Sequence, residues 1–152
     1  MWLVEGQEDV VYYPFVLDSL VARSEIEEMD AEYLTERLFG WGVGGAGNMK
    51  IVAALLAELG FERVVGLLDG NKKEELPALL EAFPRFKFDS IPANDVRTKK
   101  DGDGQAAIEG LLDSQKFLRQ EYVTAVGETM RGMLDYLRGQ RLACQGDAHL
   151  ED

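Results

Sequence analysis

The chain of 152 residues lacks features that mark several classes of protein. It has one cysteine, Cys144, so an internal disulfide is excluded and a reducing compartment is expected. It has no long apolar run and no signal-type amino terminus, so we expect a soluble, cytoplasmic protein with no membrane partner. Its one histidine, His149, lies near the carboxyl terminus, which leaves no Ser/His/Asp or Cys/His catalytic set.

Positive charge is also scarce. The 16 Lys and Arg residues face 28 Asp and Glu residues, which gives a formal net charge of −12. A protein that binds nucleic acid tightly by itself usually has a basic excess. An acidic module can still act on phosphodiesters when metal ions neutralise its carboxylates and another chain or domain supplies the basic surface. The charge therefore points to metal ions and partners.

The order of the apolar segments predicts an α/β domain with a mostly parallel sheet of about four strands flanked by helices. The expected strands cover residues 2–4, 64–68 and 86–91, and the glycine-rich segment 39–48 is a candidate for a further strand. The expected helices cover residues 9–21, 30–38, 49–59 and 76–83 and the last third of the chain. We expect one domain over residues 1–138, with 93–105 as a loop, and a polar, disordered tail over 139–152.

Several residues shape the expected helices. Pro14 is expected to break the first helix, and Asp30 to cap the second. Asn48 is expected to cap the third, which Gly60 ends. The apolar face of the third helix is expected to hold Met49, Val52, Leu55, Leu56 and Leu59. The apolar face of the last helix is expected to hold Tyr122, Val126, Met130, Met133, Leu134 and Leu137.

Two of the expected strands are followed by a carboxylate, Glu5 and Asp69. In parallel sheets, ligands bind beyond the carboxyl ends of the strands, so we expect both residues at one edge of the sheet. Asp9 follows Glu5 by one helical turn, a spacing that lets both face one point. Three convergent carboxylates favour Mg²⁺ or Mn²⁺, which suits phosphoryl transfer. The alternative is that Glu5 and Asp9 are solvated acids and helix-capping groups.

Three motifs together resemble a known domain. These are Leu3-Val4-Glu5-Gly6-x-x-Asp9, the glycine-rich turn before a helix, and the apolar strand that ends in Asp69-Gly70-Asn71. They look like the TOPRIM domain, which topoisomerases, bacterial primases, small ribonucleases and the OLD-family (overcoming lysogenization defect) nucleases share. The resemblance runs from about Trp2 to Ile91. The segments 91–100 and 110–113 are similar to the region after the fourth strand of OLD-like proteins, which favours that branch.

The resemblance implies a TOPRIM-like, Rossmann-like fold with extra C-terminal helices, and a Mg²⁺- or Mn²⁺-dependent endonuclease that nicks or cleaves DNA. By position, the implied metal ligands are Glu5, Asp9, Asp69 and Asn71. Asn71 stands where the family has a second Asp, and an amide oxygen can ligate a metal but brings no charge. OLD-like enzymes also use a downstream basic residue. The candidates here are Lys99 and Lys100, with Arg97 behind them, for stabilising the transition state.

The family resemblance also implies partners. OLD-like TOPRIM domains are fused to an ATPase that provides dimerisation and DNA contacts, and this chain has no Gly-x-x-x-x-Gly-Lys-Ser/Thr motif of its own. The expected partners are therefore DNA, an ATPase domain or subunit, and a second copy in a homo-oligomer. The expected biological setting is anti-phage defence.

The glycine-rich turn allows two interpretations. As part of the nuclease, Gly44, Gly45 and Asn48 would contact the metal site or a substrate phosphate. As an alternative, Gly42-x-Gly44-x-x-Gly47 fits the dinucleotide-binding pattern, although the strand before it would have to be the short segment 38–41. A further alternative for the whole domain is a catalytically weakened TOPRIM domain that acts as a partner-binding or regulatory subunit through its acidic face.

Overall fold

Three parallel strands form the centre of the fold. They are β1 (Trp2–Val4), β2 (Val65–Leu68) and β3 (Lys87–Ser90), in the spatial order β1-β2-β3. In the register, Trp2 lies opposite Val65, which lies opposite Lys87. The α/β class and the parallel sheet are confirmed. The computed structural model describes residues 1–40, 42–91, 111 and 117–150, and within these ranges the sheet has three strands.

The glycine-rich segment lies along the free edge of β1, but it does not continue as a strand. Leu38 forms an isolated parallel bridge with Trp2, and the N–H of Val43 donates to the carbonyl of Val4 at 2.9 Å. Gly42 and Gly44 then have φ angles of 68° and 86°. A parallel strand needs φ near −120°, so Gly42 and Gly44 cannot extend the pairing that begins at Leu38.

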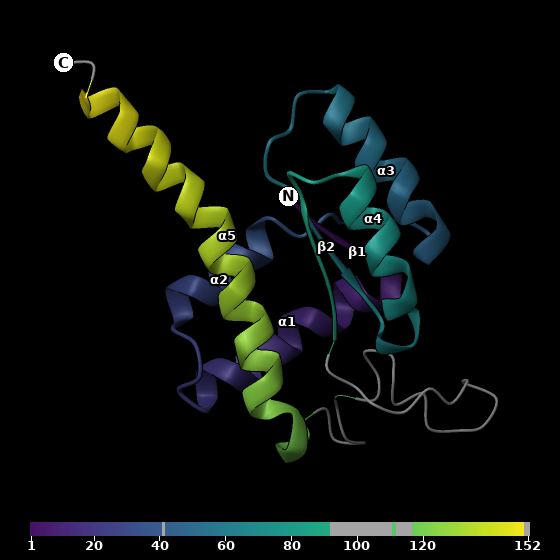
Figure 1. The fold of residues 1–152 in the computed structure, drawn as a ribbon. Coiled ribbons are helices and arrows are strands. Elements are labelled where there is room, and N and C mark those ends of the chain that lie inside the picture. Colours follow the sequence, from purple (N-terminus) through teal and green to yellow (C-terminus); the bar gives the residue numbers. More distant parts are fainter. Residues whose placement is uncertain (41, 92–110, 112–116, 151–152) are drawn as a thin grey trace.

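Helices cover both faces of the sheet (Figure 1). One face carries α1 (Gln7–Ala22), α2 (Glu28–Glu36) and α5 (Val123–Leu150), which the short turn η4 (Gln120–Tyr122) precedes. The other face carries α3 (Ala46–Glu58) and α4 (Leu76–Ala82), which the 3₁₀ turn η1 (Gly70–Glu75) precedes. No helix formed by the described residues combines the length and the hydrophobicity that a membrane span requires.

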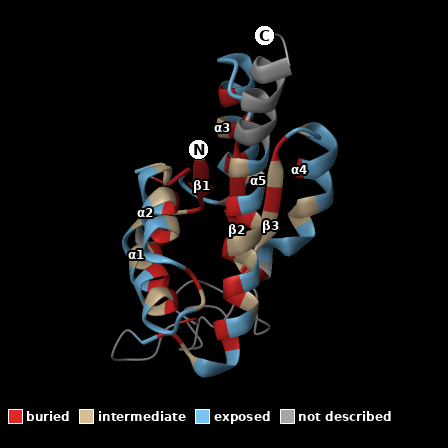
Figure 2. Ribbon diagram, turned by 90° about the vertical axis from the view of Figure 1, so that its left-hand side faces the viewer, coloured by how far each residue is buried: buried red, intermediate tan, exposed pale blue. Residues whose placement is uncertain are grey.

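The alternation of the strands divides the core in two. Trp2 and Val4 pack into the cluster under α1, α2 and α5, whereas Leu3 packs into the cluster under α3 and α4. Figure 2 shows buried residues along the strands and on the inward sides of the helices. The apolar face predicted for the last helix is confirmed, because its six residues are all buried: Tyr122, Val126, Met130, Met133, Leu134 and Leu137.

The predicted break at Pro14 is wrong, because α1 runs from Gln7 to Ala22 with Pro14 inside it. A proline in a helix interior removes one backbone hydrogen bond and costs about 3 kcal/mol. Tyr13, Leu17 and Leu20 of the same helix are at most 1% exposed. Burial of each such side chain contributes about 1.5–3 kcal/mol, so packing outweighs the cost of the proline.

Two predicted helix starts are also wrong. Glu27 precedes the first residue of α2, so Asp30 lies inside the first turn. Gly45 precedes the first residue of α3, and Asn48 lies in the first turn, where its amide donates to the carbonyl of Gly44 at 3.1 Å. Gly45 has a φ of 113°, a conformation that glycine adopts without strain, so the backbone turns into the helix before Asn48 is reached.

The apolar face predicted for α3 is only partly buried. Met49 and Leu56 lie in the core, whereas Leu55 and Leu59 are 54% and 65% exposed. The apolar stripe that α3 packs against the sheet is therefore narrower than the predicted face. Gly60 follows α3 with a φ of 87°, which confirms it as the residue that ends the helix.

The carboxyl-terminal segment falls within α5, which runs to Leu150. The side chains after Gly139 lie outside the described part of the chain. The division at residue 138, with a disordered tail after it, therefore stays a prediction.

Gly66 in the middle of β2 is required by the packing of its neighbour. Gly66 lies opposite Phe88 on β3, and a Cβ added to Gly66 would stand 2.6 Å from the Phe88 ring and 3.1 Å from the sulfur of Met49. Gly66→Ala is therefore expected to lower the free energy of unfolding by about 1–3 kcal/mol in urea denaturation, because an overpacked core must shift.

The matched control for Gly66→Ala is Gly47→Ala in α3, where an added Cβ has no atom within 4 Å. This variant is expected to be neutral or to gain up to about 1 kcal/mol from helix propensity. Equal stability of the two variants would contradict the packing explanation for Gly66.

Candidate functional site

Glu5 and Asp69 meet at the carboxyl ends of two neighbouring strands. Glu5 directly follows β1 and Asp69 directly follows β2, and the two strands are parallel. The backbone N–H of Asp69 donates a hydrogen bond to Oε2 of Glu5. The Glu5 residue is only 8% exposed. The prediction that both residues lie at one edge of the sheet is thus confirmed.

The surroundings of Glu5 favour its neutral form. Burial raises the pKa of Glu5 above its ordinary value, and the negative charge of Glu75 adds to the rise. The Asp69 N–H, the charge of Lys72 and a hydrogen bond with the Asp69 side chain lower the pKa, but burial is the largest effect. A buried carboxylate in contact with a second one is a position where a bound cation is favourable.

Asp9 caps the helix that follows Glu5. Its carboxylate accepts a hydrogen bond from the N–H of Gly6 at 2.9 Å, and the residue is 6% exposed. Of the two non-catalytic roles considered for Asp9, helix capping is therefore observed, but the side chain is buried and not solvated. Within the described part of the chain, no group of three or more His, Cys, Asp and Glu residues is placed to hold a metal ion. Asp9 as a third ligand stays a prediction.

The glycine-rich turn holds the backbone of Glu5 through hydrogen bonds. The N–H groups of Gly44 and Gly45 both donate to the backbone carbonyl of Glu5, at 2.9 and 2.7 Å. Gly42 lies so close to Gly6 that an added Cβ would be 2.6 Å from the Gly6 carbonyl carbon. The backbone of Glu5 is therefore held in place by glycines. The predicted contacts of Gly44, Gly45 and Asn48 with a metal or phosphate stay predictions.

The structure leaves other predicted residues untested. Asn71 lies in η1, but its side chain is not described. Lys99, Lys100 and Arg97 lie outside the described residues. The strand that the dinucleotide-binding alternative needs before Gly42 is not formed by the described residues there, which make only the bridge at Leu38.

Two neighbours of Glu5 were missed by the sequence analysis. Lys72 and Glu75 lie in η1, and their charges act on Glu5. The N–H of Lys72 donates to the carbonyl of Asp69 at 2.9 Å, which places this turn directly beside the strand ends. The signal that could have found them is their position within one to two turns of Asp69.

Comparisons of the chain with protein-family models, curated proteins and solved structures give no match. The interpretation of the site therefore rests on its own residues.

Proposed function

We propose that this chain is a Mg²⁺- or Mn²⁺-dependent endonuclease domain that nicks or cleaves DNA. The observation that carries the proposal is the contact of the buried Glu5 with Asp69 at the carboxyl edge of a parallel sheet. The TOPRIM-like motifs around both residues support it. Oxygen ligands of this kind suit hard divalent cations.

The donor set fits a divalent ion in its chemistry. Glu5 and Asp69 would hold the ion, and Asp9 and Asn71 would complete the set. The metal would polarise a phosphate oxygen and lower the pKa of a bound water. The chain itself contributes the fixed position of Glu5, because Gly44 and Gly45 hold its carbonyl and the Asp69 N–H holds its carboxylate.

The net charge of −12 bears on the partners. A strongly acidic surface repels a DNA backbone, so we infer that a basic surface comes from elsewhere. An ATPase domain or subunit would supply it, in keeping with the OLD-like motifs. The isolated chain is then expected to nick DNA slowly and to gain activity with such a partner.

Asp69→Asn is expected to weaken Mn²⁺ binding by about tenfold or more, because one of the two contacting carboxylates loses its charge. Isothermal titration calorimetry with Mn²⁺ measures the change. The matched control is Asp135→Asn, which removes the same charge from an exposed position on α5. If both variants bind Mn²⁺ like the unchanged protein, or if neither the variants nor the unchanged protein binds it, the proposed metal site is wrong.

A further inference from the structure

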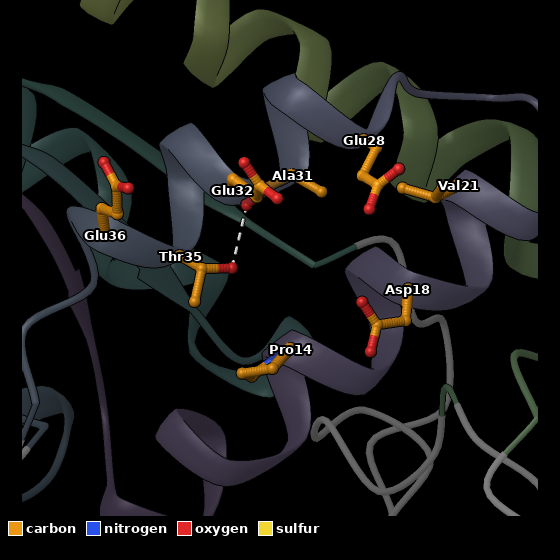
Figure 3. A pocket seen from close by; sticks show the side chains of 8 residues that line it. All are labelled: Pro14, Asp18, Val21, Glu28, Ala31, Glu32, Thr35 and Glu36. Atoms are coloured by element: carbon orange, nitrogen blue, oxygen red, sulfur yellow. Dashed lines mark hydrogen bonds between the residues drawn. The ribbon is translucent and has the colours of Figure 1, made fainter.

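A groove of about 510 Å³ lies between α1 and α2 (Figure 3), and neither Glu5 nor Asp69 is among the residues that line it. It exists because the facing side chains are short. Pro14 and Val21 of α1 face Ala31 and Thr35 of α2 across it. The hydroxyl of Thr35 donates to the carbonyl of Ala31 at 2.9 Å, so its hydrogen is already used. The floor of the groove is therefore largely apolar.

The rims of the groove are acidic on both sides. Asp18 stands on α1, and Glu28, Glu32 and Glu36 stand on α2 at successive spacings of four residues. All four side chains are exposed. Of these four acids, Glu36 alone forms an ion pair within the described residues, with Arg37 at 3.8 Å. Glu28 lies in the first turn of α2, where a negative charge is favourable, but like charges four residues apart destabilise a helix, so Glu32 and Glu36 do not help α2 to form.

Two acids close to this row, one on α2 and one in the turn before it, are paired with arginines. Asp30 forms an ion pair with Arg138 at 2.5 Å, and Glu25 forms one with Arg131 at 3.3 Å. These pairs tie α2 and the turn before it to α5. The acids of the groove make no such tie between elements within the described part of the chain. Their negative charges are therefore available to a binding partner.

We propose that this groove docks an amphipathic helix of a partner protein, with an apolar stripe for the floor and Lys or Arg on both flanks. The row from Glu28 to Glu36 covers the nine residues of α2, and the eight steps between its ends span about 12 Å of helix axis. Basic residues one turn apart on a docked helix would match it, as in other helix-in-groove complexes. The acidic rims disfavour nucleic acid and disfavour a second copy of this acidic chain. The proposal does not depend on nuclease activity.

The test uses a synthetic peptide of about 18 residues that contains only Lys, Leu and Ala, with lysines one helical turn apart on both flanks of a leucine stripe. Fluorescence anisotropy measures its affinity for the full chain. The groove variant carries Asp18→Asn, Glu28→Gln, Glu32→Gln and Glu36→Gln together. We expect it to fold and to bind the peptide at least about tenfold more weakly than the unchanged protein.

The control variant removes four negative charges outside the groove, at Glu62, Glu81, Glu121 and Glu128, each changed to Gln. It is expected to keep nearly full affinity, because these acids are exposed on other surfaces. Equal losses in the two variants would overturn the proposal, since net charge alone would then explain binding. A scrambled peptide of the same composition that binds equally well would also overturn it.

A second variant tests the floor without changing charge. Thr35→Phe puts a ring at an exposed position of α2 that lines the groove, and we expect an unchanged circular dichroism spectrum with peptide affinity lowered about tenfold. Unchanged affinity in Thr35→Phe would overturn the proposal. So would displacement of the peptide by spermine at equal concentration, because a tetracation without an apolar face would then be an equal ligand. A groove-dependent dimer in sedimentation that excludes the peptide would assign the groove to a second copy.

Discussion

Gly42→Ala is expected to lower the free energy of unfolding by about 3 kcal/mol or more, or to prevent folding. An added Cβ would stand 2.6 Å from the carbonyl carbon of Gly6 and 2.8 Å from its oxygen. Both are backbone atoms, so no side-chain rotation relieves the clash. Gly42 also has a φ of 68°, which a residue with a side chain adopts only with strain. Gly42→Ala therefore incurs both a clash with the backbone and a strained φ.

The consequence of Gly42→Ala reaches the candidate site. The contact between Gly6 and Gly42 brings the glycine-rich turn close to the end of β1, where Gly44 and Gly45 donate to the Glu5 carbonyl. Moving the turn outward to admit a methyl group would lengthen both hydrogen bonds. Whatever fraction of the variant folds is therefore expected to bind Mn²⁺ more weakly as well.

Gly40→Ala is the matched control for Gly42→Ala. It lies two residues earlier, an added Cβ has no atom within 4 Å, and its φ is not positive. Urea denaturation followed by circular dichroism is expected to give Gly40→Ala a stability within about 0.5 kcal/mol of the unchanged protein. A Gly42→Ala variant as stable as Gly40→Ala would show that the approach of Gly42 to Gly6 is not required.

The arrangement of the strands could be predicted because the signals are local and strong. Continuous apolar runs mark strands that are covered on both faces, and parallel order follows from the helices between them. The placement of Glu5 and Asp69 at one edge follows from the parallel order, whereas their contact depends on β1 and β2 being neighbours, which the structure shows. Burial of the C-terminal helix face followed from its 3.6-residue period.

Other features depend on contacts that one stretch of sequence does not reveal. The break expected at Pro14 assumed that local geometry decides, but tertiary burial of Tyr13 and Leu17 outweighs it. The helix start expected at Asn48 overlooked the positive φ of Gly45. The capping role of Asp9 depends on the direction of a side chain, which spacing leaves open. In each of these cases, the folded conformation determines a feature that the local sequence leaves open.

Glu5→Gln is expected to lower Mn²⁺-dependent DNA nicking by about two orders of magnitude or more. Metal-ion catalysis contributes several kcal/mol, and each 1.4 kcal/mol is tenfold in rate. A glutamine keeps the shape of Glu5 and can still accept the Asp69 N–H, so the change isolates the charge. The control is Glu62→Gln, an exposed position before β2 that lies at the other end of that strand. Nicking that Glu5→Gln leaves intact would exclude Glu5 as a metal ligand.

The same substitution is expected to stabilise the metal-free protein. The unfolded chain releases the Glu5 proton near the ordinary pKa of 4.5, whereas burial raises the pKa of Glu5 in the folded protein. Between these two pKa values the folded state holds more protons, so the free energy of unfolding falls as the pH rises through this window. Glu5→Gln carries no such proton and escapes this loss.

In urea denaturation with a chelator, the stability of Glu5→Gln relative to the unchanged protein is therefore expected to increase as the pH rises above about 4.5. Addition of Mn²⁺ at the higher pH is expected to reverse the order, because a ligand that binds only the folded state stabilises the unchanged protein and not the variant. If Glu5 served the fold alone, the unchanged protein would also lose stability with rising pH, but added Mn²⁺ would not restore that stability. The reversal by metal thus separates a ligand from a buried acid that serves the fold alone.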